Sequence, residues 1–299
     1  MSHEHDHEHD RTSRAFALGT LLNLAFVAVE AGFGFASRSM ALVADAGHNL
    51  GDVLGLALAW GATFLVRRKP SKRHTYGMKK ASVLTALVNA LLLVAATGAI
   101  AEESIRRLHQ PPHVAGWTVV AVALVGVLVN GGSALLFLRD EKRDLNVRSA
   151  FLHLAGDAAI ALGVAAAGVV IVLTRFYALD AIVSLVVALL VLVSALGLLR
   201  DSLGLAMDAV PAGVDIDRVR GYLAAVTGVR EVHDLHVWPM STTEFALTAH
   251  LVMDAMPGDN RLLRRVAKEL RDDLGIGHAT IQVETRESDP CHLAPEDCV

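Results

Sequence analysis

The sequence predicts an α-helical membrane protein with six transmembrane helices, followed by a small α+β domain outside the membrane. Three observations support this fold class. Of the 299 residues, 53% are hydrophobic but only 5% are aromatic, and the mean hydropathy is +0.45. Six apolar runs precede residue 200, each long enough to cross about 30 Å of hydrocarbon at about 1.5 Å per residue. After Arg200 the composition changes to the mixed pattern of a water-exposed domain.

The six spans are expected near 15–36, 41–66, 82–104, 115–138, 149–173 and 177–199. The first two are joined by only four residues, so they should form a tight hairpin. The loop 67–80 holds seven lysines or arginines and 139–148 holds four, whereas the opposite loops are poorer in basic residues. The positive-inside rule then places both termini in the cytoplasm, with the spans in the plasma or inner membrane.

The region after the spans predicts five elements in the order αββαβ, a small sandwich with one sheet covered by two helices. We expect helices at 215–226 and 259–273, and strands at 229–238, 243–254 and 278–285. Hydrophobic residues alternate along the second strand, at Phe245, Leu247, Ala249 and Leu251. This alternation indicates a sheet with one buried face.

We divide the chain into four segments: a His-rich cytoplasmic tail (1–14), the transmembrane domain (15–205), the cytoplasmic domain (206–287) and a Cys-containing tail (288–299). Residues 2–9 alternate histidine with acidic residues or serine, which suits either a metal-collecting tail or an unstructured end. Two cysteines give no disulfide framework, and the polar N-terminus does not resemble a secretory signal. The net charge of −4 argues against a nucleic-acid partner.

Two His-x-x-x-Asp pairs lie inside the second and fifth apolar runs. They are His48 with Asp52 and His153 with Asp157. Residues four apart share one helix face, and each charged group deep in a bilayer costs about 2.5–3.5 kcal/mol. The four groups therefore predict a shared divalent cation, and two imidazoles with two carboxylates suit tetrahedral Zn²⁺. The alternative is a hydrogen-bonded contact between helices without metal.

The charges of this predicted site indicate a mechanism. Zn²⁺ with two carboxylates and two neutral imidazoles is electrically neutral, and metal binding displaces ligand protons. Histidine titrates near neutral pH, so protons and Zn²⁺ compete for the same atoms. We therefore expect a metal/proton antiporter rather than an enzyme. One alternative is a membrane-embedded metalloenzyme, but an enzyme needs an open metal position and a general base. The other is a membrane-anchored zinc sensor, but an anchor needs no buried charge.

Several stretches resemble the cation diffusion facilitator family of zinc transporters. Residues 39–52 (SMALVADAGHNLGD) and 151–157 (FLHLAGD) resemble its second and fifth helices, and 75–77 (TYG) and 232–238 (VHDLHVW) also match. The resemblance implies a homodimer with a ferredoxin-like cytoplasmic domain and proton-coupled efflux of Zn²⁺ by alternating access. Chains with His and Asp in both pairs resemble the zinc-preferring branch, with Cd²⁺ and Co²⁺ as further candidate substrates.

A second metal site is expected in the cytoplasmic domain. His233 and His250 lie on adjacent predicted strands and resemble family positions that bind cytoplasmic metal. We add Glu284 from the third strand and the tail thiols Cys291 and Cys298, because thiolates bind zinc tightly. The alternative is that the cysteines are exposed thiols and His236 pairs within its strand. His236 stands three residues after His233, so we expect the two side chains on opposite faces.

Three further residues are candidates for an accessory role: Asn23 in the first span, Asp45 before the first pair, and His74 in the basic loop. Asn23 alternatively forms a plain interhelical hydrogen bond, and one histidine cannot hold a loop metal by itself. Four other polar residues in the spans are expected to form structural hydrogen bonds, namely Glu30, Asn89, Asn130 and Asp180. The predicted partners are divalent metal ions, protons, the lipid bilayer and a second copy of the chain.

Overall fold

A computed structural model of the chain describes residues 24–137 and 145–285. The chain divides into two units. One contains Met1–Ala57 and Asn89–Gly197, and the other contains Leu58–Val88 and Leu198–Val299. The predicted candidates Asn23, Cys291 and Cys298 lie outside the described residues.

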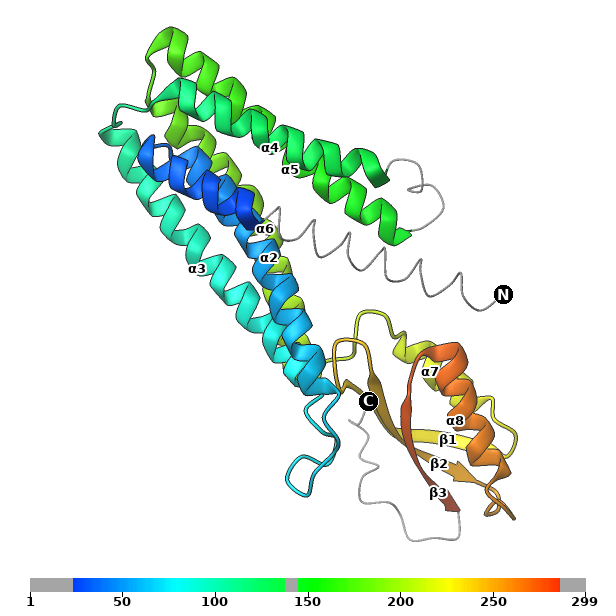
Figure 1. Cartoon of the computed structure of the whole chain (residues 1–299). Helices are drawn as coiled ribbons and strands as arrows, with labels where there is room; N and C mark the ends of the chain where they lie inside the picture. Colours follow the sequence, from blue (N-terminus) through cyan, green and yellow to red (C-terminus); the bar gives the residue numbers. More distant parts are fainter. Residues whose placement is uncertain (1–23, 138–144, 286–299) are drawn as a thin grey trace. The chain divides into compact units, whose positions relative to one another are not determined.

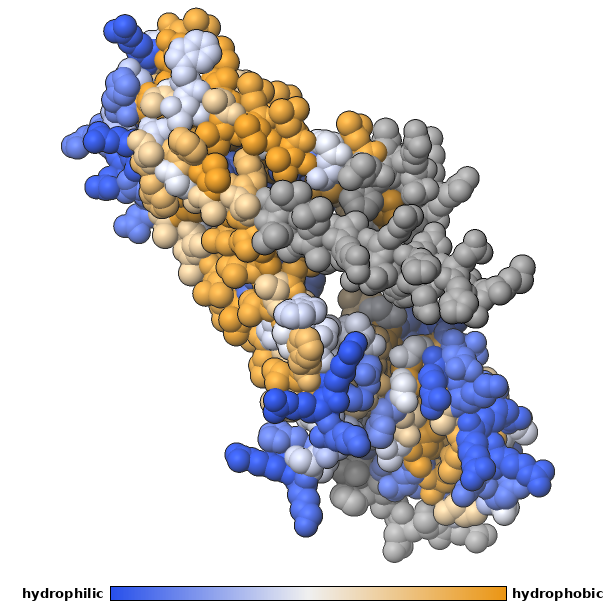
Figure 2. Space-filling model, in the orientation of Figure 1, coloured by the Kyte–Doolittle hydropathy of each residue, from blue (hydrophilic) through white to orange (hydrophobic). Residues whose placement is uncertain are grey.

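Among the described residues, five helices are long and apolar enough to cross a membrane, and their visible face is largely hydrophobic (Figure 2). A shorter apolar helix, Leu24–Ala36, precedes them. The pattern confirms the predicted membrane fold, although the helices expected at 82–104 and 177–199 continue past these ends. The long helices are α2 (Met40–Val66), α3 (Ala81–His109), α4 (Gly116–Phe137), α5 (Leu145–Thr174) and α6 (Ala178–Ala206).

The start of α2 is fixed by a buried carboxylate from α6. Asp180 accepts hydrogen bonds from the backbone N–H groups of Met40 (2.6 Å) and Ala41 (3.4 Å), and from the Ser39 hydroxyl. The Ser39 oxygen in turn accepts from the N–H of Leu42 at 3.2 Å. First-turn N–H groups have no partner within a helix, so these contacts satisfy them and let α2 begin directly after the short connection.

Glycines bring α2 close to α3. Gly47, Gly51 and Gly55 are spaced four apart, so they share one face of α2. A Cβ atom on Gly51 would lie 2.1 Å from Leu93 Cδ2, and one on Gly55 would lie 2.9 Å from Asn89 Nδ2. Small residues at this spacing allow close helix packing in lipid, where the hydrophobic effect does not drive helices together. The glycine face therefore lies against side chains of α3, on the helix that also carries His48 and Asp52.

A second close approach joins α4 and α5, which lie side by side (Figure 1). A Cβ atom on Gly168 would lie 2.9 Å from Val120 Cγ2 and 3.2 Å from the carbonyl oxygen of Gly116. The backbones can approach this closely only because both positions lack side chains. This packing supports α5, which carries His153 and Asp157.

The αββαβ order of the second domain is confirmed. Asp215 caps the first helix, accepting from the N–H groups of Asp217 and Arg218, and Gly275 ends the second with a φ of 71°. The sheet order is β1-β2-β3, with β1 and β2 antiparallel and β2 and β3 parallel. The elements are α7 (Ile216–Ala224), β1 (Val229–Pro239), β2 (Phe245–Met253), α8 (Arg261–Leu274) and β3 (His278–Thr285).

One face of the sheet is buried, as the alternation in β2 predicted. Leu247, Ala249 and Leu251 are fully buried and pack against Leu223 of α7 and Leu270 of α8. Figure 1 shows both helices beside the sheet. The β2 residues that alternate with these three buried ones face the other side of the sheet, and His250 is among them.

A β-bulge in β1 overturns one expectation. His233 pairs with His250, but His236 pairs with Thr248, so β1 has one more residue than β2 over this stretch. The extra residue accompanies a left-handed backbone at Asp234, with a φ of 50°. The bulge returns His236 to the same sheet face as His233. The prediction of opposite faces was therefore wrong, because simple alternation does not hold across a bulge.

Candidate metal centres

The structure brings together the four polar side chains of the two membrane motifs. His48 Nε2 lies 3.2 Å from Asp157 Oδ1 and 3.8 Å from Asp52 Oδ2. His153 Nε2 lies 3.3 Å from Asp52 Oδ2 and 3.7 Å from Asp157 Oδ2. The two imidazole rings are 6.1 Å apart between centroids and nearly perpendicular. Each carboxylate is therefore shared between an imidazole of α2 and one of α5, and we call these four side chains the membrane quartet.

The spacing of the quartet fits the size of a zinc coordination shell. Zinc binds nitrogen and oxygen ligands at about 2.0–2.2 Å, so neighbouring ligand atoms of a tetrahedron are about 3.3–3.6 Å apart. The four nitrogen–oxygen distances span 3.2 to 3.8 Å. Ligand atoms of His48, Asp52 and Asp157 all lie within 4.8 Å of one another. His153 lies near both carboxylates but outside this tight group, so its imidazole would have to move toward the other three side chains for the quartet to enclose one divalent cation.

The electrostatics of the quartet also favour a cation. The Asp157 side chain is 7% exposed and the His48 side chain 16%, whereas that of His153 is 50% exposed. Asp52 Oδ2 is buried and accepts no hydrogen bond of good geometry. Within residues 24–137 and 145–285, no lysine or arginine forms an ion pair with either aspartate. Two carboxylates without fixed counter-charge need protons or a metal ion.

The remaining accessory candidates do not join the quartet. Asp45 is 1% exposed, and its carboxyl group lies within hydrogen-bonding distance of that of Glu30, on the helix Leu24–Ala36. His74 is exposed in the loop between α2 and α3, and its backbone N–H donates to Ser71 Oγ at 3.1 Å. No metal-ligand cluster around His74 is found in the described part of the chain.

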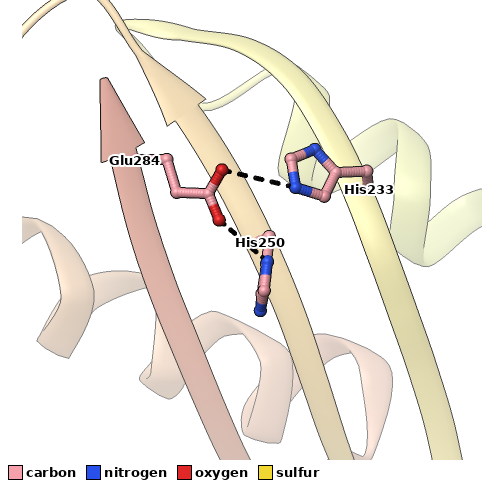
Figure 3. Close-up of side chains that lie close together, drawn as sticks. All are labelled: His233, His250 and Glu284. Atoms are coloured by element: carbon pink, nitrogen blue, oxygen red, sulfur yellow. Dashed lines mark ion pairs between the residues drawn. The ribbon is translucent and has the colours of Figure 1, made fainter. Parts of the chain in front are cut away.

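A second cluster joins the three strands of the sheet, each of which contributes one side chain (Figure 3). His250 Nδ1 lies 2.9 Å from Glu284 Oε1, and His233 Nε2 lies 3.5 Å from Glu284 Oε2. The two rings are 5.3 Å apart between centroids. Cross-strand pairing of His233 with His250 sets this distance, and Glu284 stands on the same sheet face two residues beyond the partner of His250. We call these three residues the sheet cluster.

The sheet cluster has the donor set of a metal site. Both ring nitrogens of His233 are buried and form no hydrogen bond with the described residues, although Nδ1 lies 3.7 Å from Glu231 Oε1. Buried polar atoms in this state are costly unless another group satisfies them. Two imidazoles and a carboxylate suit three of the four ligand positions of tetrahedral zinc. His236 is not in the cluster, because its side chain is 55% exposed and its Nε2 lies 2.9 Å from Asp234 Oδ1.

The sequence analysis missed Asp234. Its second oxygen, Oδ2, lies 3.5 Å from His250 Nε2, so its carboxylate stands between His236 and a sheet-cluster ligand. In metal sites, a carboxylate beside the non-coordinating nitrogen of a histidine orients the ring and raises its basicity. The signal was present in the VHDLHVW stretch, where an acidic residue lies between two histidines. The bulge brings this carboxylate beside the sheet cluster.

Comparison with known proteins identifies the family. Residues 17–205 match the model of the cation efflux transmembrane domain, and residues 211–286 match that of the cation efflux protein cytoplasmic domain. The zinc transporter ZitB of Escherichia coli is 37% identical over 98% of this chain and 94% of that protein.

Two further relatives have similar coverage. A cadmium, cobalt and zinc/H(+)-K(+) antiporter of Bacillus velezensis is 31% identical over 95% of this chain and 92% of that protein. The metal cation efflux system protein CzcD of Cupriavidus metallidurans is 32% identical over 98% and 91%. These relatives are named for transport of metal cations and not for an enzymatic reaction. With both domain models and near full-length relatives above 30% identity, this integral membrane chain belongs to the cation diffusion facilitator family of metal-cation efflux transporters.

Proposed function

We propose that the protein exports Zn²⁺ from the cytoplasm in exchange for protons, by alternating access of the membrane quartet. The observation that carries this proposal is the set of four nitrogen–oxygen distances, 3.2 to 3.8 Å, between ligand-type side chains of α2 and α5. The names of the relatives support zinc as the substrate and proton exchange as the mode. Cd²⁺ and Co²⁺ have overlapping ligand preferences and are secondary substrates in this proposal.

The chemistry of exchange follows from the charge of the quartet. With Zn²⁺ bound, two carboxylates balance the metal and both imidazoles stay neutral. When the metal leaves, protons on the imidazoles offset the two negative charges, which keeps the site near neutral in a low-dielectric surrounding. Zinc and protons therefore occupy the quartet in turn. A proton gradient directed inward then drives zinc outward.

We further propose the arrangement in the cell. Both termini and the α7–β3 domain are in the cytoplasm, because the lysines and arginines concentrate in the loops 67–80 and 139–148. The transmembrane domain covers 15–205 and the cytoplasmic domain 206–287, between a His-rich tail and a Cys-containing tail. The working unit is a homodimer in the plasma membrane.

The sheet cluster is proposed as a resident cytoplasmic zinc site. His233, His250 and Glu284 would hold the ion, and the two tail cysteines are the proposed source of its further ligands. The bound ion would tie three strands together at one face of the sheet. The buried nitrogens of His233, which form no hydrogen bond within residues 24–137 and 145–285, support this assignment.

Transport into proteoliposomes tests the main proposal. An imposed pH difference should drive zinc across the membrane against its own gradient in the unsubstituted protein, and Asp157→Ala should abolish this movement. Glu102→Ala is the matched control, because Glu102 is exposed on α3. A zinc sensor or a metalloenzyme would move no zinc in either protein. Unimpaired transport by a correctly folded Asp157→Ala variant would refute the assignment of the quartet.

The cytoplasmic site has a separate test. His250→Ala in the full-length protein should bind one zinc ion fewer per chain, measured by elemental analysis after equilibrium dialysis. His278→Ala is the control on β3, since His278 is exposed and contacts the ring of Tyr76. An equal zinc count in His250→Ala and the control would remove the sheet cluster as a zinc site.

A further inference from the structure

A pair of carboxyl groups lies buried beside the quartet and takes no part in it. Glu30 is 0% exposed and Asp45 is 1% exposed. Their carboxyl groups, on the helix Leu24–Ala36 and on α2, lie within hydrogen-bonding distance of each other. Two acceptors can share a hydrogen bond only if one of them is protonated.

Close packing of the two helices brings these carboxyl groups together. A Cβ atom on Gly34 would lie 2.9 Å from Val43 Cγ2 and 3.2 Å from the Val43 nitrogen. Gly34 stands one turn after Glu30, so the helices approach closely where the pair forms. The pair therefore lies beside a close approach of the two backbones.

The surroundings of the pair contain no fixed positive charge. Glu30 Oε2 receives one hydrogen bond, from Asn49 Nδ2 at 3.4 Å. The other three carboxyl oxygens, Glu30 Oε1 and both oxygens of Asp45, are buried and receive no hydrogen bond from any described residue outside the pair. The titratable groups whose charges act on the pair are His48 of α2 and Asp157 of α5. No hydrogen bond or ion pair between described residues joins the pair to either of them.

We propose that Glu30 and Asp45 form a second proton-binding site, which holds one shared proton when the quartet is empty and releases it when Zn²⁺ binds. This inference rests on the proposed zinc/proton exchange and deepens it. Two adjacent buried carboxylates cannot both ionise without a cation between them, so one keeps a proton. A divalent ion in the quartet adds positive charge one helical turn from Asp45 and favours loss of that proton. The proton leaves as H⁺ to solvent, and no bond other than O–H breaks.

Counting the protons released on zinc binding tests this site without transport. Zinc is titrated calorimetrically into the purified full-length protein in two buffers of different ionisation enthalpy, which gives the number of protons released per zinc. Glu30→Gln and Asp45→Asn should each release fewer protons than the unsubstituted protein, by up to one, with zinc still bound. Glu103→Gln is the matched control, because Glu103 pairs with Arg106 and Arg107 and carries no proton to release.

Infrared spectroscopy gives an independent reading. A protonated carboxyl group has a carbonyl stretch distinct from that of a carboxylate, and this band should weaken when zinc is added to the unsubstituted protein. The band should be absent in both pair variants and unchanged in the Glu103→Gln control. Because zinc affinity in the same titration reports whether a variant is folded, a variant that fails to bind is replaced by the milder Glu30→Asp, which should retain both the band and its response.

Each outcome is decisive for the pair. Equal proton release in the pair variants and in the control, with the band retained, would overturn the proposal. Absence of the band together with zinc binding that depends on K⁺ would also overturn it, since a metal cation would then occupy the pair. Failure of the proposed function differs from both results, because Asp157→Ala would then bind and move zinc normally whatever the pair does.

Discussion

The cap on α2 gives the sharpest prediction about stability. Replacing Asp180 by alanine removes the acceptor of two backbone N–H groups, those of Met40 and Ala41, and of the Ser39 hydroxyl. These residues are almost completely buried, with exposures of 6%, 1% and 0%. Water therefore cannot replace the lost acceptor without opening the structure.

The magnitude follows from the number of orphaned donors. Each buried donor without a partner costs about 1–3 kcal/mol, so the two backbone groups cost about 2–6 kcal/mol. Removing the buried Asp180 carboxylate also removes its own desolvation cost, which offsets part of this loss. We expect a net destabilisation of about 2–4 kcal/mol. At about 2–4 °C per kcal/mol for a domain of this size, Tm should fall by about 4–16 °C.

Thermal unfolding of the detergent-solubilised protein measures this effect, in zinc-free buffer so that metal binding adds nothing. Asp180→Asn should lower Tm less than Asp180→Ala does, because the amide oxygen can still accept hydrogen bonds from the backbone N–H groups. Asp201→Ala is the control, since Asp201 is exposed on the same helix. If Asp180→Ala melts at the temperature of this control, the carboxylate does not stabilise the start of α2 and the reasoning fails.

Two further predictions use packing and titration. Gly168→Ala should destabilise by about 1–3 kcal/mol, because the new methyl group meets Val120 and a backbone oxygen. Gly163→Ala, with open space at its Cβ, should stabilise α5 by up to about 1 kcal/mol; equal Tm values for the two variants would contradict the close approach. Tyr222→Phe should cost about 1 kcal/mol, because Tyr222 donates to Glu269 Oε2 at 2.6 Å. Burial, and then Glu269, raise the pKa of Tyr222. The hydroxyl therefore stabilises fully below its unfolded pKa of about 10, and its contribution is lost as pH rises through the higher folded value. Chemical unfolding should show that the difference in free energy of unfolding between Tyr222→Phe and the unsubstituted protein becomes smaller from neutral to alkaline pH. A difference that stays constant would contradict this expectation.

Much of the fold was predictable because it depends on local periodicity. Five membrane helices and all five elements of the second domain lie close to their expected ranges, since apolar runs and alternation directly encode buried surfaces. The two His-x-x-x-Asp pairs were also visible, because four-residue spacing places side chains on one helix face. Their convergence was inferred from the cost of buried charge, and the coordinates bring these side chains within 3.2 to 3.8 Å.

Features that depend on contacts between distant segments were not predictable in the same way. The glycines at 47, 51 and 55 have a visible spacing, but the sequence does not say which helix packs against them. Asp180 was expected to form structural hydrogen bonds, but its position at the start of α2 requires two helices distant in sequence to meet. Glu30 likewise meets Asp45 only because the helix Leu24–Ala36 packs against α2.

The sequence alone determined the membrane fold, the order of elements in the second domain and the chemical types of the candidate ligands, because these follow from patterns within single segments. The tertiary structure decided which ligands meet. A bulge of one residue at Asp234 placed His236 on the same sheet face as His233, against simple alternation. Helix packing at glycines placed a buried acidic pair beside the quartet. Both outcomes depend on how backbones approach across long sequence separations, and no local pattern encodes that geometry.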